Sequence, residues 1–220
     1  MNTIKFICTI VVVFVSMSFA QVLTFDKDDL GKSPKNFSTA LTGNGKTGVW
    51  IIVKDETAPS QPNVLAQTDM DNTGYRFPIC IYDNFTGKDV DLSVKFKPMK
   101  GDEDRAAGLV WRYKDKNNYY IVRANALEDN VVLYKVENGK RSDLPLIGKG
   151  KTYGMKTKVA PGEWGMLRII AKGNHFEAIL NGSKLFDVED NTFNEAGKVG
   201  VWTKADSYTL FDDLTISPIK

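Results

Sequence analysis

The chain has 220 residues, of which 42% are hydrophobic, and its 29 basic side chains nearly balance 27 acidic ones. No basic block stands out, so the sequence lacks the electrostatic footprint of a nucleic-acid-binding protein. The length beyond the N-terminal segment, about 200 residues, suits one β domain that buries a core without disulfides.

Residues 1–20 are predicted to be a secretory signal peptide. Lys5 is their only charge, an apolar run occupies 6–15, and the small residues Ser18 and Ala20 stand where a signal peptidase reads. We therefore expect cleavage after Ala20, a secreted or periplasmic location, and a folded domain over 21–220. The apolar run is too short to be read as a membrane span, and no later segment is long and apolar enough to cross a bilayer.

The rest of the chain predicts short strands in succession. Residues 26–65 are rich in Gly, Pro, Ser, Thr and Asn, which predicts mostly loop with one strand at 48–55. Further along, apolar and polar residues alternate in short segments bounded by turn residues, as in β-strands. Strands are predicted at 91–98, 108–114, 119–125 and 130–136, and further ones within 165–190 and 197–217. Because helical periodicity is almost absent, we expect a single all-β domain, a sandwich or barrel.

Residues 108–125 predict a hairpin whose two faces differ in character. With a loop at 115–118, Val110 pairs with Arg123 and Arg112 pairs with Ile121. One face is then apolar and aromatic, as expected for a core: Leu109, Trp111, Tyr113, Tyr120, Val122 and Ala124. The opposite face mixes apolar, aromatic and polar groups: Val110, Arg112, Lys114, Tyr119, Ile121, Arg123 and Asn125. A register slip of one residue would exchange the two faces.

The mixed face supports two interpretations. Arg112 and Arg123 lie one diagonal step apart in the predicted register, and planar guanidinium groups hold ligand oxygens in fixed geometry. A sugar- or acid-binding surface is therefore one interpretation. The other is an ordinary solvated sheet face with surface salt bridges.

Cysteine and histidine are too scarce for several common site types. After removal of the signal peptide Cys80 is the only cysteine, which excludes an intramolecular disulfide, and its apolar neighbours predict a buried, inert thiol. The single histidine, His175, is predicted at a hairpin turn, which excludes a multi-histidine metal site and disfavours a Ser-His-Asp triad. No nucleotide-binding glycine motif is present.

Three segments carry a resemblance to a known family. They are "GLVWRYKDKNNYYIVRANALEDNVVLYKVENGKR", "PGEWGMLRIIAKGNHFEAILNG" and the closing "VGVWTKAD" with "FDDL". In these segments the chain resembles secreted bacterial proteins of the 3-keto-disaccharide hydrolase domain family, which is related to glycoside hydrolase family 16 and to concanavalin-A-like lectins. The resemblance implies a jelly-roll sandwich of two antiparallel sheets, with a carbohydrate bound across the concave sheet face.

The resemblance also implies a choice of chemistries. Family 16 hydrolases use an E-x-D-x-x-E strand, and no glutamate in this chain begins that pattern. In a 3-keto sugar, elimination can replace direct hydrolysis, which needs one base and groups that stabilise an oxyanion. Glu128 would be the base, and Arg112 or Arg123 would stabilise the enolate. The alternatives are a glycan-binding module without catalysis and a structural or adhesion domain.

Further residues are candidates for binding at the same face or for holding a metal. Tyr119 and Asn125 lie on the mixed face, and Lys204 and Asp206 are expected at its rim. The sequence supports no nucleotide or redox cofactor. Related sandwiches often hold a structural calcium near the closing strand, and Asp26 with Asp213 or its neighbour Asp212 offers suitable oxygen ligands. We expect the protein to act as a monomer.

Overall fold

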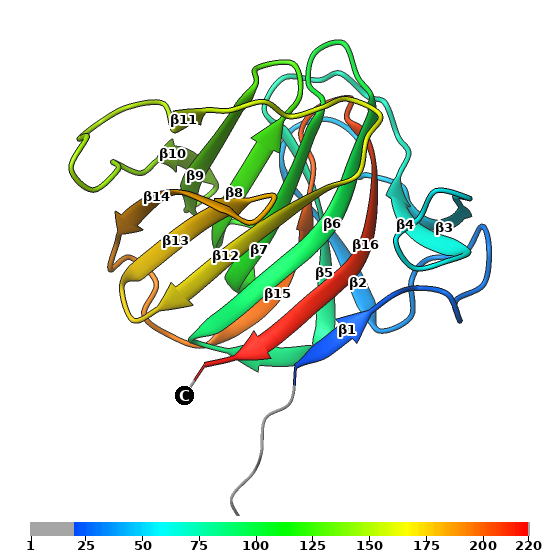
Figure 1. Cartoon of the computed structure of the whole chain (residues 1–220), viewed down its shortest axis with the longest axis horizontal. Helices are drawn as coiled ribbons and strands as arrows, with labels where there is room; N and C mark the ends of the chain where they lie inside the picture. The colour runs from blue at the N-terminus through cyan, green and yellow to red at the C-terminus, as the bar shows by residue number, and fades with distance from the viewer. Residues whose placement is uncertain (1–19, 220) are drawn as a thin grey trace, which may run out of the picture.

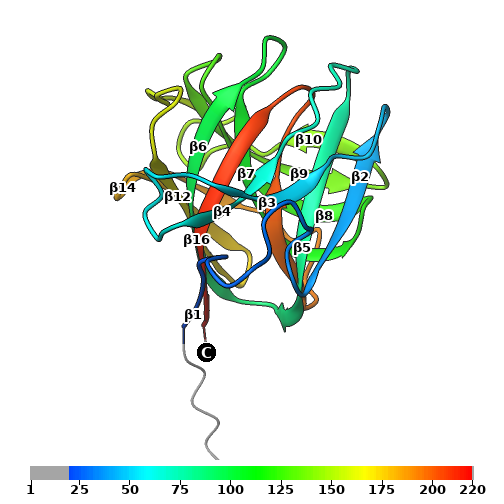
Figure 2. The same ribbon diagram turned by 90° about the vertical axis from the view of Figure 1, so that its right-hand side faces the viewer.

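The computed structural model of the chain describes residues 20–219, in which every regular element is a β-strand. Of the predicted signal peptide, residues 1–19 lie outside the described residues, and Ala20 is the first residue within them. Within the described part of the chain no helix is long and apolar enough to cross a membrane. The strands form two antiparallel sheets that pack face to face, visible as two layers in Figure 2.

The first sheet lies in front in Figure 1 and has the order β14-β13-β12-β6-β16-β4-β3, with β1 paired to β16. Its strands are β1 (Gln21–Leu23), β3 (Trp50–Lys54), β4 (Asn63–Gln67), β6 (Val90–Lys100), β12 (Gly165–Lys172), β13 (His175–Leu180), β14 (Ser183–Glu189) and β16 (Tyr208–Pro218). Neighbours in this sheet such as β6 and β16 are distant in sequence, so the fold depends on non-local pairing.

The second sheet lies behind the first in Figure 1 and has the order β10-β9-β8-β7-β15-β5-β2, with β11 paired to β9. Its strands are β2 (Phe37–Gly43), β5 (Arg76–Gly87), β7 (Ala106–Asp115), β8 (Asn118–Asn125), β9 (Asn130–Glu137), β10 (Lys140–Asp143), β11 (Met155–Lys156) and β15 (Gly197–Trp202). The candidate site residues discussed below lie mainly on this sheet.

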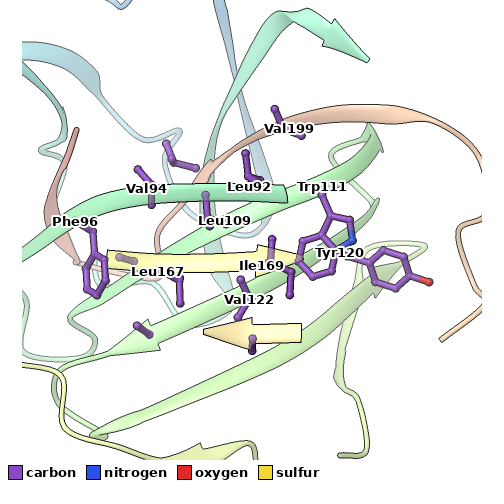
Figure 3. Packing of buried hydrophobic residues seen from close by; sticks show 14 of the residues in the cluster. Leu92, Val94, Phe96, Leu109, Trp111, Tyr120, Val122, Leu167, Ile169 and Val199 are labelled. Carbon is purple, nitrogen blue, oxygen red and sulfur yellow. The ribbon is translucent and has the colours of Figure 1, made fainter. Parts of the chain in front are cut away.

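The main core fills the space between the two sheets. Along β6, Leu92, Val94 and Phe96 are buried while the residues between them are only half-buried, because successive side chains point to opposite faces. Side chains of β7 and β8, such as Trp111 and Tyr120, meet them from the second sheet (Figure 3). Burial of these aliphatic and aromatic side chains stabilises the sandwich.

The outward face of the second sheet is also buried, because this sheet curls over itself. Thr42 on the edge strand β2 hydrogen-bonds through its hydroxyl to the Lys116 carbonyl in the β7–β8 turn. The Tyr75 hydroxyl donates to the carbonyl of Gly139 in the β9–β10 turn, over 3.2 Å. These contacts close one end of the curl around a second apolar cluster that includes Phe77, Ile79, Val110, Tyr119, Ile121, Tyr134 and Trp202. We call this inner surface of the curl the concave face.

Most of the expected strands are confirmed. The residues of the Asn138-Gly139 and Asn181-Gly182 turns have positive φ, as such tight hairpin turns require. Cys80 is fully buried, and burial raises the pKa of its thiol well above the usual value. Within 26–65 the strand at Trp50–Lys54 is confirmed, but the expectation of loop at 37–43 was wrong. That segment forms the edge strand β2, whose partial exposure weakens the alternation of apolar residues.

The hairpin of β7 and β8 departs from the predicted register by two residues. Val110 pairs with Ile121 rather than with Arg123, and a shift of two leaves the two faces unchanged. A bulge follows Trp111, and there Arg112 takes a left-handed φ of 48°. Gly197 on β15 allows this, because a side chain there would place its Cβ 2.4 Å from the Arg112 carbonyl carbon.

The bulge exchanges the faces of two predicted residues. Tyr113 packs against the cluster on the concave face, not in the main core. The prediction that Arg112 shares a face with Arg123 was wrong, because its guanidinium turns to the edge of the main core and lies over Phe176, 5.3 Å from the ring centroid. It donates to the carbonyls of Lys88, Phe193 and Gly173 and pairs with Asp89. In this position Arg112 ties together loops at one end of the sandwich.

Replacing Arg112 with Met should therefore destabilise the fold. The side chain is only 1% exposed, and its loss leaves three carbonyls and Asp89 without their donor. We expect a loss of about 3 kcal/mol in the free energy of unfolding, measured by urea denaturation. The control is Arg168→Met, which removes a more exposed ion pair with Asp91 and should cost no more than about 1 kcal/mol. Equal losses in the two variants would contradict the structural role of Arg112.

Candidate functional site

Charged and amide side chains gather at the open end of the concave face, opposite the end closed by the turns. Arg123 on β8 is fully buried and forms a two-pronged ion pair with Glu128 in the β8–β9 turn, through NH1–Oε1 at 3.2 Å and NH2–Oε2 at 3.0 Å. Asn130, at the start of β9, accepts a third hydrogen bond from Arg123 and donates one to Glu128. The antiparallel turn between β8 and β9 brings these residues together, since Asn125 pairs with Asn130.

A second buried pair adjoins the first. Lys204, in the loop after β15, places its ammonium group 2.6 Å from the carboxylate of Asp104, which is 1% exposed. The Asn125 amide donates to the other oxygen of Asp104 over 2.7 Å. The two pairs interact electrostatically. The charge of Arg123 acts to lower the pKa of Asp104, and the charge of Lys204 acts to lower the pKa of Glu128. We refer to Arg123, Glu128, Asn125, Asn130, Asp104 and Lys204 together as the Arg123 cluster.

The two carboxylates of the cluster differ in proton affinity. Burial alone would raise the pKa of Glu128, but the ion pair with Arg123 and the hydrogen bond from Asn130 lower it to about 2. Burial raises the pKa of Asp104 above its usual value despite the opposing charge of Lys204. Asp104 is therefore the better proton acceptor, and Glu128 is a fixed negative charge.

An aromatic surface continues from the cluster along the concave face. The guanidinium of Arg123 lies 5.7 Å from the ring centroid of Tyr134 on β9 and 5.8 Å from that of Tyr153 in the loop before β11. Tyr134 donates a 2.8 Å hydrogen bond to the hydroxyl of Tyr153. The residue Tyr153 remains 51% exposed. Tyr134 also contacts Arg141 of β10, whose guanidinium lies 4.5 Å from its ring centroid. The concave face thus carries two arginines around one tyrosine.

The structure brings together four of the residues predicted to form the site: Arg123, Glu128, Asn125 and Lys204. Three others do not join the cluster, and the first of them, Arg112, lies at the edge of the main core. Tyr119 is fully buried near the closed end, where its hydroxyl lies 2.9 Å from that of Thr42. The carboxylate of Asp206 accepts backbone N–H groups of residues 102, 103 and 104, so it holds the loop that carries Asp104 rather than facing a ligand.

The sequence analysis missed Asp104, Asn130, Tyr134, Tyr153 and Arg141. One signal for Arg141 was present, because the Asn138-Gly139 turn pairs it with Val136 and so places it on the same face as Tyr134. Nothing in the local sequence distinguishes Asp104 from its acidic neighbours Asp102 and Glu103, since only the long-range contacts with Lys204 and Asn125 bury it.

The carboxylates proposed for calcium lie at the opposite sheet, around the β16 bulge. Asp212 and Asp213 both contact Ser60, through its backbone N–H and its hydroxyl respectively. Burial, together with the charges of Asp213 and Asp26, raises the pKa of Asp212 to about 7. Oxygen donors of this kind suit a hard divalent cation, whose charge would relieve that repulsion. We propose that Asp26, Asp212 and Asp213 hold a structural calcium ion.

Among the described residues, the group whose ligand atoms lie within 4.8 Å of one another is a different one, formed by His175, Glu177 and Asp187. The ammonium group of Lys184 lies 2.8 Å from Asp187 and 3.2 Å from Glu177. This lysine already balances the carboxylates, so the group is best described as an ion-pair network on the β13–β14 hairpin.

Fold and site together define a jelly-roll sandwich of the concanavalin-A-like class with a polar cluster at one end of its curled sheet. The family described as "3-keto-alpha-glucoside-1,2-lyase-like domain" matches residues 24–217, and the chain belongs to this family. The predicted family resemblance is thereby confirmed, while the relation to glycoside hydrolase family 16 stays a prediction. No curated protein matches the chain.

Solved structures share the fold at low sequence identity. The carbohydrate-binding module CBM66 from Bacillus subtilis superposes with a TM-score of 0.61 and 21% identity, covering 83% of this chain and 95% of the module. The cellulose-induced protein Cip1 superposes with a TM-score of 0.60 and 16% identity, covering 91% of this chain and 97% of Cip1. Domain 4 of the GH43 arabinanase AbnA from Geobacillus stearothermophilus was solved with arabinotriose. It superposes with a TM-score of 0.56 and 16% identity, covering 90% of this chain and 93% of the domain. At these identities the likeness establishes the fold alone.

The calcium proposal predicts a pH-dependent stability. A carboxyl whose pKa is raised by folding to about 7 stabilises the fold fully at low pH and loses that contribution as the pH rises through about 7. In the presence of a chelator the melting temperature should therefore fall between about pH 5 and pH 8, and millimolar calcium should largely remove this fall. Asp212→Asn should abolish both effects, measured by thermal unfolding.

Asp29→Asn, at a well-exposed acid near Asp28, is the control and should behave like the wild type. If calcium raised the melting temperature of Asp212→Asn as much as that of the wild type, the ion would bind elsewhere.

Proposed function

We propose that the protein is a secreted or periplasmic carbohydrate-active domain that acts as a monomer and binds a sugar at the Arg123 cluster. The observation that carries this proposal is the combination of fixed donors and acceptors with an exposed aromatic ring. Lys204 supplies a donor, Glu128 supplies acceptor oxygens, and Tyr153 supplies a ring face beside them. Binding sites for small ligands combine an apolar lining with a few well-placed polar groups of this kind.

The rigidity of the cluster also supports a binding role. Arg123 is held by Glu128 and Asn130, and the loop that carries Asp104 is held by Asp206. Polar groups fixed by such neighbours bind with a small loss of conformational entropy. Relatives in fold point to the same chemistry, since one is named a carbohydrate-binding module and another was solved with arabinotriose.

The family description favours a second candidate, elimination from a 3-keto glucoside. In that reaction a base removes the C2 proton, a C1=C2 double bond forms, the C1–O bond breaks, and the departing oxygen takes up a proton. We propose that the Asp104–Lys204 pair accepts the C2 proton and returns a proton to the leaving oxygen. The raised pKa of Asp104 supports this assignment, whereas the pKa of about 2 makes Glu128 a weak base. Arg123 would stabilise the enolate.

Incubation with matched disaccharides separates the two candidates. The wild type, Asp104→Asn and Lys204→Met are each tested with a plain disaccharide and its 3-keto form. Products are followed by chromatography and binding by calorimetry. We expect release from the keto sugar only, and a fall in rate of about 100-fold in Asp104→Asn, because general acid–base groups typically contribute this much. Lys95→Met, on the other sheet, is the control.

Binding without release from either sugar would leave a glycan-binding domain and exclude the elimination. Neither binding nor release would contradict the sugar site as a whole and favour a structural or adhesion role.

A further inference from the structure

Arg141 on the short strand β10 occupies an aromatic cradle on the concave face. Its guanidinium carbon lies 4.4 Å from the ring centroid of Phe77 and 4.5 Å from that of Tyr134, on strands β5 and β9. Trp202 of β15 stacks on Phe77 and lies 5.9 Å from the same guanidinium. Three strands that are distant in sequence thus converge on one positive charge. The cradle holds the guanidinium plane in a defined place, because its rings are fully or almost fully buried.

This arginine differs from the other arginines of the curled sheet in having no acidic partner. Arg76 pairs with Asp69, and Arg123 pairs with Glu128. Over residues 20–219 the side chain of Arg141 makes neither an ion pair nor a hydrogen bond, and its NH1 atom is buried without an acceptor. Placing a cation in such surroundings without a counter-charge is unfavourable, and cation–π contacts offset only about 1 kcal/mol of that cost each. An external anion would compensate the remainder.

Two exposed tyrosines flank the cradle. Tyr75 is 41% exposed and packs edge-on against Phe77, with ring centroids 4.7 Å apart. Tyr153 is 51% exposed and packs against Tyr134, with centroids 6.1 Å apart. The Tyr75 hydroxyl also accepts the backbone N–H of Arg141, which fixes the strand next to the ring. Exposed aromatic rings beside a polar anchor are suited to stacking against a sugar ring.

The cradle adjoins the Arg123 cluster, because Tyr134 contacts both guanidinium groups, at 4.5 Å from Arg141 and 5.7 Å from Arg123. One ligand can therefore reach both. Arg123 is already neutralised by Glu128, so of these two arginines Arg141 is the one whose charge is left for a ligand.

The geometry points to a subsite for an acidic sugar, in which the carboxylate of a uronic acid unit pairs with Arg141 and the neighbouring sugar unit lies at the Arg123 cluster. This inference rests on the proposed sugar binding and specifies its substrate class. A carboxylate fits better than a sulfate ester, because a planar guanidinium and a planar carboxylate form two parallel hydrogen bonds. Tyr75 or Tyr153 contributes the ring face on which the uronic acid stacks.

The test compares a disaccharide that carries one glucuronic acid unit with the same disaccharide whose carboxyl group has been reduced to the alcohol. Calorimetry is performed on the wild type, Arg141→Gln, Arg141→Lys and the control Arg168→Gln, whose arginine pairs with Asp91 on the other sheet. We expect the wild type and the control to bind the acidic disaccharide at least tenfold more tightly than the reduced one. Arg141→Gln should lose this preference while still binding the reduced sugar, and Arg141→Lys should keep part of it. Thermal melting of each variant establishes that it is folded.

Each other outcome has a distinct meaning. Equal affinity of the wild type for the acidic and reduced sugars would overturn the acidic subsite and leave the proposed sugar binding intact. An acid preference that survives in folded Arg141→Gln would also overturn it, because the carboxylate would then bind elsewhere. Tighter binding of a sulfated disaccharide than of the uronic acid would overturn the assignment to a carboxylate. Absence of binding by both sugars would overturn the subsite and the proposed function together.

Discussion

The curl of the second sheet is the constraint on which the candidate site depends. An antiparallel sheet in a sandwich commonly leaves one face to solvent, yet here contacts from Thr42 and Tyr75 to the β7–β8 and β9–β10 turns close that face into a second apolar cluster. Phe77 and Trp202 fill its interior. A polar side chain that points to this face therefore enters a dehydrated environment, where charges must be paired or bound to a ligand.

The electrostatics of the site follow from this dehydration. In a poorly hydrated environment an ion pair shifts proton affinities strongly, and so Arg123 lowers the pKa of Glu128 to about 2 although burial acts in the opposite direction. For Asp104 burial prevails over Lys204, and its pKa rises. Two carboxylates at the same end of the curl thus have different chemical capacities. The same enclosure surrounds the guanidinium of Arg141 with aromatic rings rather than with a carboxylate.

The strand pattern allowed part of the site to be predicted, and a local irregularity limited the rest. Arg123, Asn125 and Glu128 follow one another along β8 and its turn, so period-two alternation was sufficient to group them. Period-two alternation placed Arg112 on the same predicted face as Arg123, and it was therefore grouped with these residues. The bulge after Trp111 instead turns its side chain to the other side of the sheet. The bulge forms against Gly197 of β15, a strand far along the chain, and so local pattern could not reveal it.

The sequence by itself determined the all-β class, the buried thiol of Cys80 and the family, because alternation, apolar surroundings and family motifs are properties of short segments. Only the tertiary structure decided which polar residues meet. Asp104 becomes a buried carboxylate paired with Lys204, and the pKa of Asp212 rises through burial and the charge of Asp26, although the residues concerned lie about a hundred or more positions apart. Burial and charge pairing depend on such non-local packing, and these two quantities set the chemistry of the site.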